Sequence, residues 1–294
     1  MRKCLYWNFR SRKAYNKIAR EGGMMKKSII LLFILFMFLQ GSCFYIRVDY
    51  PHERGRTPLD EFHKNVSLSP GGTLSLRNVN GNVEINGWAS EELDVYAEKM
   101  IQLPDRSKFY VYPRKDFAPG IVFDKFENFV KIMTKNISED KEIGYVDYFI
   151  DVPHSINLKD IVVRRGNITI NEVYGDAFLE VAEGDIVVEN FSGSLTASVT
   201  QGSVKASLFD LREEDEIILD TREGNITLSL QEDANAHLVV VFPEGEVNSE
   251  FELELPLDVK KIDMQLGENG PRISITAMRG NVNIKKIKKD GMFF

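Results

Sequence analysis

A nine-residue repeat runs through the middle of the chain and restricts its fold more than any other feature. Five consecutive units read GNITINEVY, GDAFLEVAE, GDIVVENFS, GSLTASVTQ and GSVKASLFD, and they begin at Gly166, Gly175, Gly184, Gly193 and Gly202. The second position is always Asn, Asp or Ser, and the third and fifth positions are always apolar. Alternating apolar residues predict a strand with one buried face, and Gly followed by a small polar residue predicts the turn before it.

The repeat alternates between two forms, so its true period is eighteen residues. Units one, three and five carry a larger apolar residue at position eight, at Val173, Phe191 and Phe209, whereas units two and four carry it at position seven, at Val181 and Val199. Two strands and two turns per repeat are typical of a solenoid, in which each coil covers the apolar face of the next. We therefore predict an all-β fold, a single-chain β-solenoid of the β-helix or β-roll type with coils of about 18 residues.

Stacking of coils assigns an inside and an outside to neighbouring residues. Val188 occupies position five, as do Ile170 one coil earlier and Ala206 one coil later. We expect these three side chains to stack inside the solenoid, about 4.8 Å apart. Val187 lies one step along the strand and should point outward, because successive strand side chains alternate between faces.

Variants of the unit recur outside this block, as GNVEI at Gly81, GNITL at Gly224 and GNVNI at Gly280. The strand that follows Gly280 carries four lysines, at Lys285, Lys286, Lys288 and Lys289. Charged edge strands prevent end-to-end pairing, so we interpret this strand as the terminal cap of the solenoid. A basic tail that binds anionic lipid is the alternative.

Residues 96–152 interrupt the repeat. Strand-like runs such as Phe109–Tyr112, Phe129–Met133 and Tyr145–Val152 are separated here by Pro and Gly. We predict longer antiparallel strands, inserted between the first coil and the rest.

The N-terminal region has the pattern of an address rather than of a folded element. Lys26 and Lys27 precede eleven uninterrupted apolar residues, 29–39, and Gln-Gly-Ser-Cys follows at 40–43. A short basic region, a short apolar stretch and small residues are typical of a secretory signal, which we assign to residues 24–43. Eleven helical residues span about 16 Å, roughly half of the hydrocarbon thickness of a bilayer.

The end of this segment, Leu-Gln-Gly-Ser-Cys at 39–43, resembles a bacterial lipobox, in which lipid is attached to the Cys. The motif prefers Leu three places before the Cys, whereas here Gln40 holds that position and Leu39 precedes it. Cys43 is therefore the predicted lipidation site, with an uncleaved anchor extending through residues 44–46, or ordinary cleavage, as alternatives. Phe44 after the Cys resembles the outer-membrane default of a bacterium with two membranes.

The remaining segments complete the predicted organisation. Met24 and Met25 before the basic pair resemble a start site, so we interpret residues 1–23 as a mis-called extension, with a long basic leader as the alternative. Residues 44–68 contain Pro and Gly among many charges without periodicity, which predicts a tether. The solenoid domain is assigned to residues 69–290.

The charge of the chain is unevenly distributed. Residues 1–43 hold nine Lys or Arg and one acid, which leaves 28 basic and 43 acidic residues in 44–294, a net charge of −15. Such a body repels phosphate backbones, so we expect no nucleic acid partner. The two cysteines, Cys4 and Cys43, both precede the body, which therefore holds no internal disulfide.

A search for chemistry leads us to expect no catalytic residue, no metal and no cofactor. The four histidines, His52, His63, His154 and His237, show no metal-ligand spacing. Calcium-binding rolls need Gly-Gly-x-Gly-x-Asp, whereas each unit here has one Gly. A carbohydrate-active β-helix enzyme is the enzymatic alternative. Its candidate carboxylate-and-aromatic face would combine the outward residues of position four with neighbouring acids, namely Thr169, Phe178, Val187, Thr196 and Lys205 with Glu180, Glu183 and Glu189.

Three stretches carry a resemblance to a known family: LSLRNVNGNVEINGW from Leu74, Val-Pro-His from Val152 with the Gly-Asn/Asp-Ile units from Gly166, and LGENGPRISI from Leu266 with GNVNI. With these stretches the chain resembles the bacterial "putative adhesin" domain of unknown function. Together they cover roughly residues 70–288. The resemblance implies a β-solenoid of exported and lipid-anchored proteins, and it supplies no catalytic residues.

We therefore expect an exported, membrane-anchored protein of the cell envelope that is not an enzyme. Its rigid solenoid surface would serve adhesion, or would bind an envelope polymer or envelope protein, while the N-terminal lipid or anchor contacts the membrane. A regulatory partner in envelope-stress sensing is the alternative function. The sequence names no ligand, and adjacent genes for a sigma factor and its antagonist would favour regulation.

Lipidation at Cys43 is directly testable. The protein should partition into detergent and incorporate a palmitate analogue in growing cells, and Cys43→Ala should abolish the label and release the protein. Label that persists in Cys43→Ala would instead support an uncleaved anchor.

Overall fold

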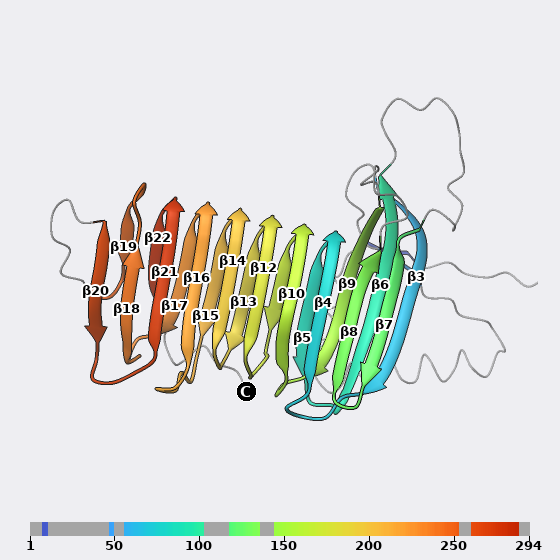
Figure 1. The fold of residues 1–294 in the computed structure, drawn as a ribbon, viewed down its shortest axis with the longest axis horizontal. Helices are drawn as coiled ribbons and strands as arrows, with labels where there is room; N and C mark the ends of the chain where they lie inside the picture. Colours follow the sequence, from blue (N-terminus) through green and yellow to red (C-terminus); the bar gives the residue numbers. More distant parts are fainter. Residues whose placement is uncertain are drawn as a thin grey trace, which may run out of the picture. The chain divides into compact units, whose positions relative to one another are not determined.

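The structure, a computed structural model, describes residues 8–10, 47–49, 56–102, 118–135, 144–252 and 260–287. The chain divides into two compact units, Met1–Arg56 and Thr57–Phe294. In the first unit the described residues form one parallel pair, β1 (Asn8–Arg10) with β2 (Arg47–Asp49). The second unit holds two ten-stranded sheets (Figure 1). None of the described residues belongs to a helix with the length and apolar character that crossing a bilayer requires.

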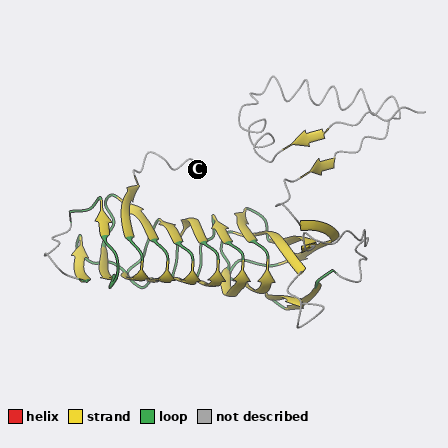
Figure 2. Cartoon of the chain, turned by 90° about the horizontal axis from the view of Figure 1, so that it is seen from above, coloured by secondary structure: helices red, strands yellow, loops and turns green. Residues whose placement is uncertain are grey.

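The two sheets of the second unit, named sheet I and sheet II, lie face to face and are joined by short turns (Figure 2). In spatial order, sheet I consists of β20 (Lys261–Leu266), β18 (Ala236–Val241), β21 (Arg272–Arg279), β16 (Glu216–Glu223), β14 (Leu195–Gln201), β12 (Ala177–Glu183), β10 (Asn157–Arg165), β4 (Thr73–Asn80), β8 (Phe129–Lys135) and β7 (Gly120–Phe126). Sheet II consists of β19 (Val247–Ser249), β22 (Val282–Ile287), β17 (Ile226–Gln231), β15 (Val204–Leu208), β13 (Ile186–Phe191), β11 (Ile168–Asn171), β5 (Val83–Trp88), β9 (Gly144–Pro153), β6 (Glu92–Gln102) and β3 (Arg56–Ser67).

This arrangement confirms the predicted β-solenoid. Successive strands of the repeat alternate between sheets, so β12 and β14 lie in sheet I while β11, β13 and β15 lie in sheet II. Val188 pairs with Ile170 on one side and with Ala206 on the other, and all three are completely buried. Val187 is only partly buried on the outer face. The eighteen-residue period therefore corresponds to one coil of the solenoid.

The core consists of rows of aliphatic side chains that run across the strands. In sheet II the third position of the unit forms one such row, at most 1% exposed, from Val83 through Ile168, Ile186, Val204 and Ile226 to Val282. Full burial of an aliphatic side chain stabilises the fold by roughly 1.5–3 kcal/mol, which offsets the entropy lost on ordering each coil.

The strands at the start of the domain stack out of sequence order. β8 pairs parallel with β4, and β9 pairs parallel with β5. The strands β8 and β9 therefore form a coil outside the first coil, which consists of β4 and β5. The predicted antiparallel pairing is present between β7 and β8 and between β6 and β9. The insertion nevertheless does not separate the first coil from the rest, because β4 and β5 contact β10 and β11 directly. The predicted strand at Phe109–Tyr112 lies outside the described residues.

The other end of the domain is also out of order, and here the predicted terminal cap is wrong. β22 is flanked by β17 on one side and by β19 on the other, so it is an internal strand. Lys285 and Lys286 lie beyond the three residues of β22 that pair with β19. Their side chains are therefore exposed although β22 is an internal strand. The edges at this end are β19 and β20, and Lys288 and Lys289 lie outside the described residues.

Two further expectations need correction. Part of the segment predicted to be a tether, residues 44–68, belongs to the domain, because β3 is hydrogen-bonded to β6 and Leu68 is completely buried. Its apolar residues Phe62 and Val66 pack against the core. Because they stand among charged residues in the sequence, they do not produce a recognisable strand pattern. In unit five the pairing shifts by one residue, so that Leu208 rather than Phe209 stacks on Phe191 and is buried.

A polar network is buried where the β8–β9 coil meets the first coil. Tyr148 takes the place of an aliphatic residue opposite Val83 and is 1% exposed. The Thr134 hydroxyl donates to Asn78 Oδ1 at 2.8 Å and lies 2.8 Å from the Tyr148 hydroxyl, so Tyr148 donates to Thr134. Asn78 Nδ2 donates to the backbone oxygen of Val146 at 2.8 Å. Burial raises the pKa of Tyr148 to about 12, and the Thr134 hydroxyl opposes the rise because it can turn to donate to the phenolate.

The coil register can be tested with two neighbouring substitutions. Val188→Asp places an unpaired charge in the stacked core and should lower the free energy of unfolding by roughly 3–5 kcal/mol. Val187→Asp, the matched control, points outward beside Lys205 and should change it by about 1 kcal/mol or less. Thermal and urea melts of both variants measure the difference. Equal destabilisation, or the reverse order, would contradict the register.

The buried phenol makes stability pH-dependent above pH 10. An unfolded Tyr148 loses its proton near pH 10 whereas the folded one keeps it to about 12, so the folded state loses roughly 2–3 kcal/mol across that interval. Tyr148→Phe should cost about 1 kcal/mol at neutral pH through the lost hydrogen bond, and should be the more stable protein near pH 12. Urea melts from pH 7 to 12 test for this crossover. A constant stability difference would show that Tyr148 is not the titrating group.

Candidate functional site

The turns that lead from sheet I into sheet II share one geometry. Gly184 has a φ of 137°, and a Cβ there would lie 2.2 Å from the carbonyl oxygen of Gly166 in the coil before. Only Gly fits that space. The next residue then links the coils, as Asn167 Oδ1 accepts from the Asp185 backbone N–H at 2.8 Å. This first turn ladder joins, in spatial order, Asp147, Asn82, Asn167, Asp185, Ser203, Asn225, Asn281 and Glu246.

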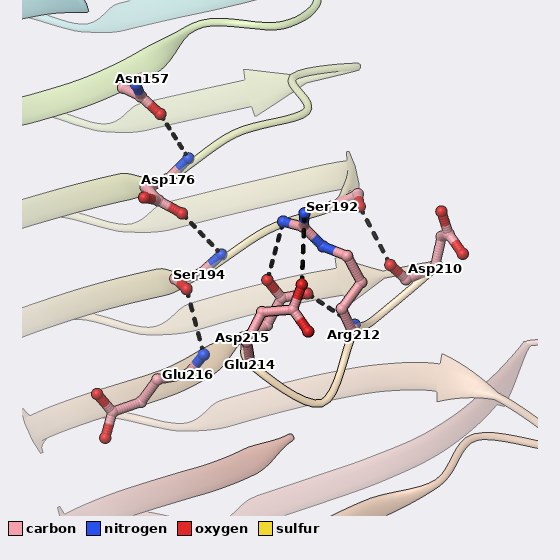
Figure 3. A network of polar contacts seen from close by, with 9 residues as sticks. All are labelled: Asn157, Asp176, Ser192, Ser194, Asp210, Arg212, Glu214, Asp215 and Glu216. Atoms are coloured by element: carbon pink, nitrogen blue, oxygen red, sulfur yellow. Dashed lines mark hydrogen bonds and ion pairs between the residues drawn. The ribbon is translucent and has the colours of Figure 1, made fainter. Parts of the chain in front are cut away.

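A second turn ladder connects the turns that lead from sheet II into sheet I (Figure 3). Asn157 Oδ1 accepts from the Asp176 N–H at 3.0 Å, and Asp176 Oδ1 accepts from the Ser194 N–H at 3.3 Å. Ser194 Oγ continues the ladder by accepting from the Glu216 N–H at 3.2 Å. The Asn, Asp or Ser at position two therefore serves as a hydrogen-bond acceptor for the backbone of the following coil.

The candidate face derived from the sequence is divided between the two sheets, so that prediction is wrong. Consecutive nine-residue units alternate between sheets, and their position-four residues therefore cannot share one face. Thr169, Val187 and Lys205 belong to strands of sheet II, whereas Phe178 and Thr196 belong to sheet I. The acids divide likewise, with Glu180 and Glu183 on β12 and Glu189 on β13.

Two of these acids are engaged in exposed ion pairs. Glu183 lies 3.1 Å from Arg165, and Glu189 lies 2.7 Å from Lys205. Across the described ranges, no group of three or more His, Cys, Asp or Glu side chains is arranged to hold a metal ion. The described histidines have other contacts: His63 lies 2.9 Å from Asp94, and His237 lies 2.7 Å from Asp263.

His154 belongs to a stack of rings at the ends of the sheet II strands. Its ring lies parallel to that of Tyr174, with centroids 5.1 Å apart, and the rings of Tyr174 and Phe209 are perpendicular, with centroids 5.4 Å apart. His154 Nδ1 is 2.8 Å from the backbone oxygen of Glu172. Burial, with a smaller contribution from the Glu172 charge, raises the pKa of Tyr174. His154 covers one face of the Tyr174 ring, and Tyr174 is 39% exposed.

An open ring is present on sheet I. Phe178 is 42% exposed and borders a hollow of about 400 Å³ on the outer face. The hollow is lined by Thr73, Asn157, Leu158, Lys159, Asp176, Ala177, Phe178, Ser194 and Thr196. It therefore adjoins the second turn ladder, which supplies Asn157, Asp176 and Ser194.

A β-bulge in β10 accompanies this hollow. Leu158 pairs with Ala177 and Ile161 pairs with Leu179, so two residues of β10 stand opposite the single Phe178 of β12. The same shift occurs toward β4 on the other side. Asp160, within the bulge, has a φ of 54°, which is uncommon for a residue other than Gly. Bulges frequently occur beside functional sites, where they redirect side chains.

One protein family matches the sequence of this chain. The Toastrack DUF4097 domain matches residues 134–285, just over half of the chain. The chain belongs to the Toastrack DUF4097 family. The match runs from β8 into β22, so it contains the whole nine-residue repeat and every residue that lines the Phe178 hollow except Thr73. It also confirms the family resemblance stated from the sequence.

Solved structures similar to this Toastrack chain come from several bacteria. A "putative cell adhesion protein" of Clostridium sporogenes is 13% identical, with a TM-score of 0.46, and the alignment covers 79% of this chain and 100% of that one. A "putative adhesin" of Bacteroides fragilis is 11% identical, with a TM-score of 0.30, over 78% of this chain and 97% of that one. The search of curated proteins found no match.

The hollow of this Toastrack domain was not among the sites predicted from the sequence. The predicted lipidation site, Cys43, lies outside the described residues. The hollow had a signal in the sequence, because Leu158 and Ile161 are both inward although three positions apart, in a strand that otherwise alternates. That spacing indicates an extra residue, and hence a bulge, opposite Phe178.

Proposed function

We propose that the chain is a non-catalytic protein of the cell envelope whose solenoid surface binds an envelope polymer or another envelope protein, in adhesion. The observation that supports this most is the pair of outer sheet faces. Along each face, equivalent residues of successive coils stand in register, held by parallel backbone pairing and by the two turn ladders. A face of this kind presents the same spacing to a ligand over many coils without reorganising on binding.

The location is proposed from the sequence. Residues 24–43 have the pattern of an export signal that ends at Cys43, and the body that follows carries an acidic excess suited to a soluble exported domain. In this proposal the lipid on Cys43, or an uncleaved anchor, holds the chain at the membrane. Residues beyond the anchor would then connect the solenoid to the membrane surface.

One arrangement favours a carbohydrate-active enzyme as the second candidate. Glu180 pairs with Ser198, and Ser198 with Asp220, so the two acids share a row, two strand spacings or about 10 Å apart at the backbone. Partial burial raises the pKa of Asp220, although a hydrogen bond from Thr276 opposes the rise. An inverting glycosidase needs carboxyl groups roughly 6.5–9.5 Å apart. Glu180 is exposed on the open face, however, and neither acid lines the hollow, so water is not excluded from the pair.

Binding and catalysis can be separated in one experiment. The full chain, purified in detergent, is incubated with purified cell-wall sacculi, and the pelleted protein and the released reducing sugar are both measured. In parallel, cross-linking in intact cells identifies envelope proteins in contact with the chain. We expect retention on sacculi or a specific cross-linked envelope protein, with no released sugar.

The control is Asp220→Asn, which should leave binding unchanged. Sugar release that is lost in Asp220→Asn would show an enzyme and contradict the proposal. Cross-linking only to a component of stress signalling would support the regulatory alternative instead. The absence of both sacculus binding and an envelope cross-link would also contradict the proposal.

A further inference from the structure

We infer that the hollow beside Phe178 is a saccharide subsite, which binds one pyranose ring of a glycan with a sugar face stacked on the Phe178 ring. This inference rests on the proposed function and assigns the ligand class and the contact residue on sheet I. It depends on four features of the hollow: an open ring, its polar lining, its charge, and its position inside a sheet.

The Phe178 ring is open because the bulge removes its neighbour on one side. On the β14 side Thr196 stands in register with Phe178, but on the β10 side Lys159 and Asp160 share the place of one residue. Lys159 is exposed, and Asp160 is directed toward Arg77, with the two charged groups 3.9 Å apart. The negative π-face of an aromatic ring attracts polarised C–H groups, which the axial face of a pyranose provides.

The polar lining suits the hydroxyl groups of a sugar. Asn157 has an amide nitrogen that can donate, and Thr73 and Thr196 carry hydroxyls that can donate or accept. Asp176 uses Oδ1 in the second turn ladder, which leaves its other carboxylate oxygen to accept (Figure 3). The turn ladder also fixes the positions of Asn157 and Asp176 before any ligand binds, which lowers the entropy cost of binding.

Size and charge restrict the ligand further. A volume of about 400 Å³ is at the small end of ligand pockets and accommodates a sugar ring rather than a large ligand. The lining contains one basic residue, Lys159, and one acidic residue, Asp176. This balance favours a neutral sugar over a polyanionic chain, which would need several cations.

The position of the hollow disfavours a peptide strand as the occupant. Peptides that extend a sheet need an edge with unpaired backbone groups. β12 is paired on both sides, with β10 and with β14, so its backbone groups are already used. A ligand at this place must therefore be recognised by side chains. Beside the hollow, β14 presents Thr196, Ser198 and Thr200 outward, which offers hydroxyls to the next units of a glycan chain.

Calorimetric titration of the full chain in detergent tests the subsite. The probes are the β-1,4-linked tetramers of glucose and of N-acetylglucosamine, both uncharged. We expect at least one tetramer to bind, Phe178→Ala to weaken it by about tenfold or more, and Phe178→Trp to keep it. Tyr174→Ala, the matched control, removes another exposed ring, one whose face is stacked on His154 and which lies outside the hollow, and should leave affinity unchanged.

Each other outcome overturns the subsite. Affinity that is equal in wild type and Phe178→Ala, or that falls equally in Tyr174→Ala, would show that the Phe178 ring is not the platform. Failure of both tetramers to bind the wild type would also remove the inference. Thermal melts of Phe178→Ala should match those of wild type, since the ring is exposed. Retention of Phe178→Ala on sacculi or on an envelope protein would leave the proposed function intact while removing this site.

Discussion

At the turns from sheet I into sheet II the backbones of neighbouring coils are in close contact. There the backbone of one Gly lies so near the carbonyl oxygen of the Gly below that a methyl group would meet it at about 2 Å, as at Gly184 over Gly166 and Gly202 over Gly184. This contact fixes the rise from coil to coil at the spacing of parallel strands. The acceptor side chain that follows each Gly completes the link by occupying the backbone N–H of the next coil.

The rows of side chains on both faces of the sheets follow the register of these turns. Aliphatic rows form because position three lies over position three, and the outer rows form for the same reason on the opposite face. Parallel backbone pairing between successive strands of each sheet holds this order. Where the order changes, as in the β10 bulge, the change is local and the next coil returns to the common register.

The repeat predicted the fold well because its signals are local. Gly, a small polar residue and alternating apolar residues specify a turn and a strand within nine positions, so the placement of Val188 against Ile170 and Ala206 followed directly. Spatial order at the two ends is not local. The residues of β8 and β22 have ordinary strand patterns, and nothing in them records which strand becomes their neighbour. The candidate face failed for a related reason, since period nine suggests one row whereas period eighteen makes two.

The internal position of β21 and β22 has a consequence for the order in which the domain folds. These strands are the last described in sequence, yet they separate β16 and β17 from β18 and β19. When the chain is synthesised from its N-terminus, β18 is available while the position beside β16 is still empty. Leu238 and Val240 of β18 have the same alternation as Ile273 and Ile275 of β21, which pair with β16 in the folded domain. Coil-by-coil growth therefore meets a competing partner just before completion. A chain truncated before Arg272 would not be one coil shorter, but would expose an apolar row that β18 could cover in a non-native pairing.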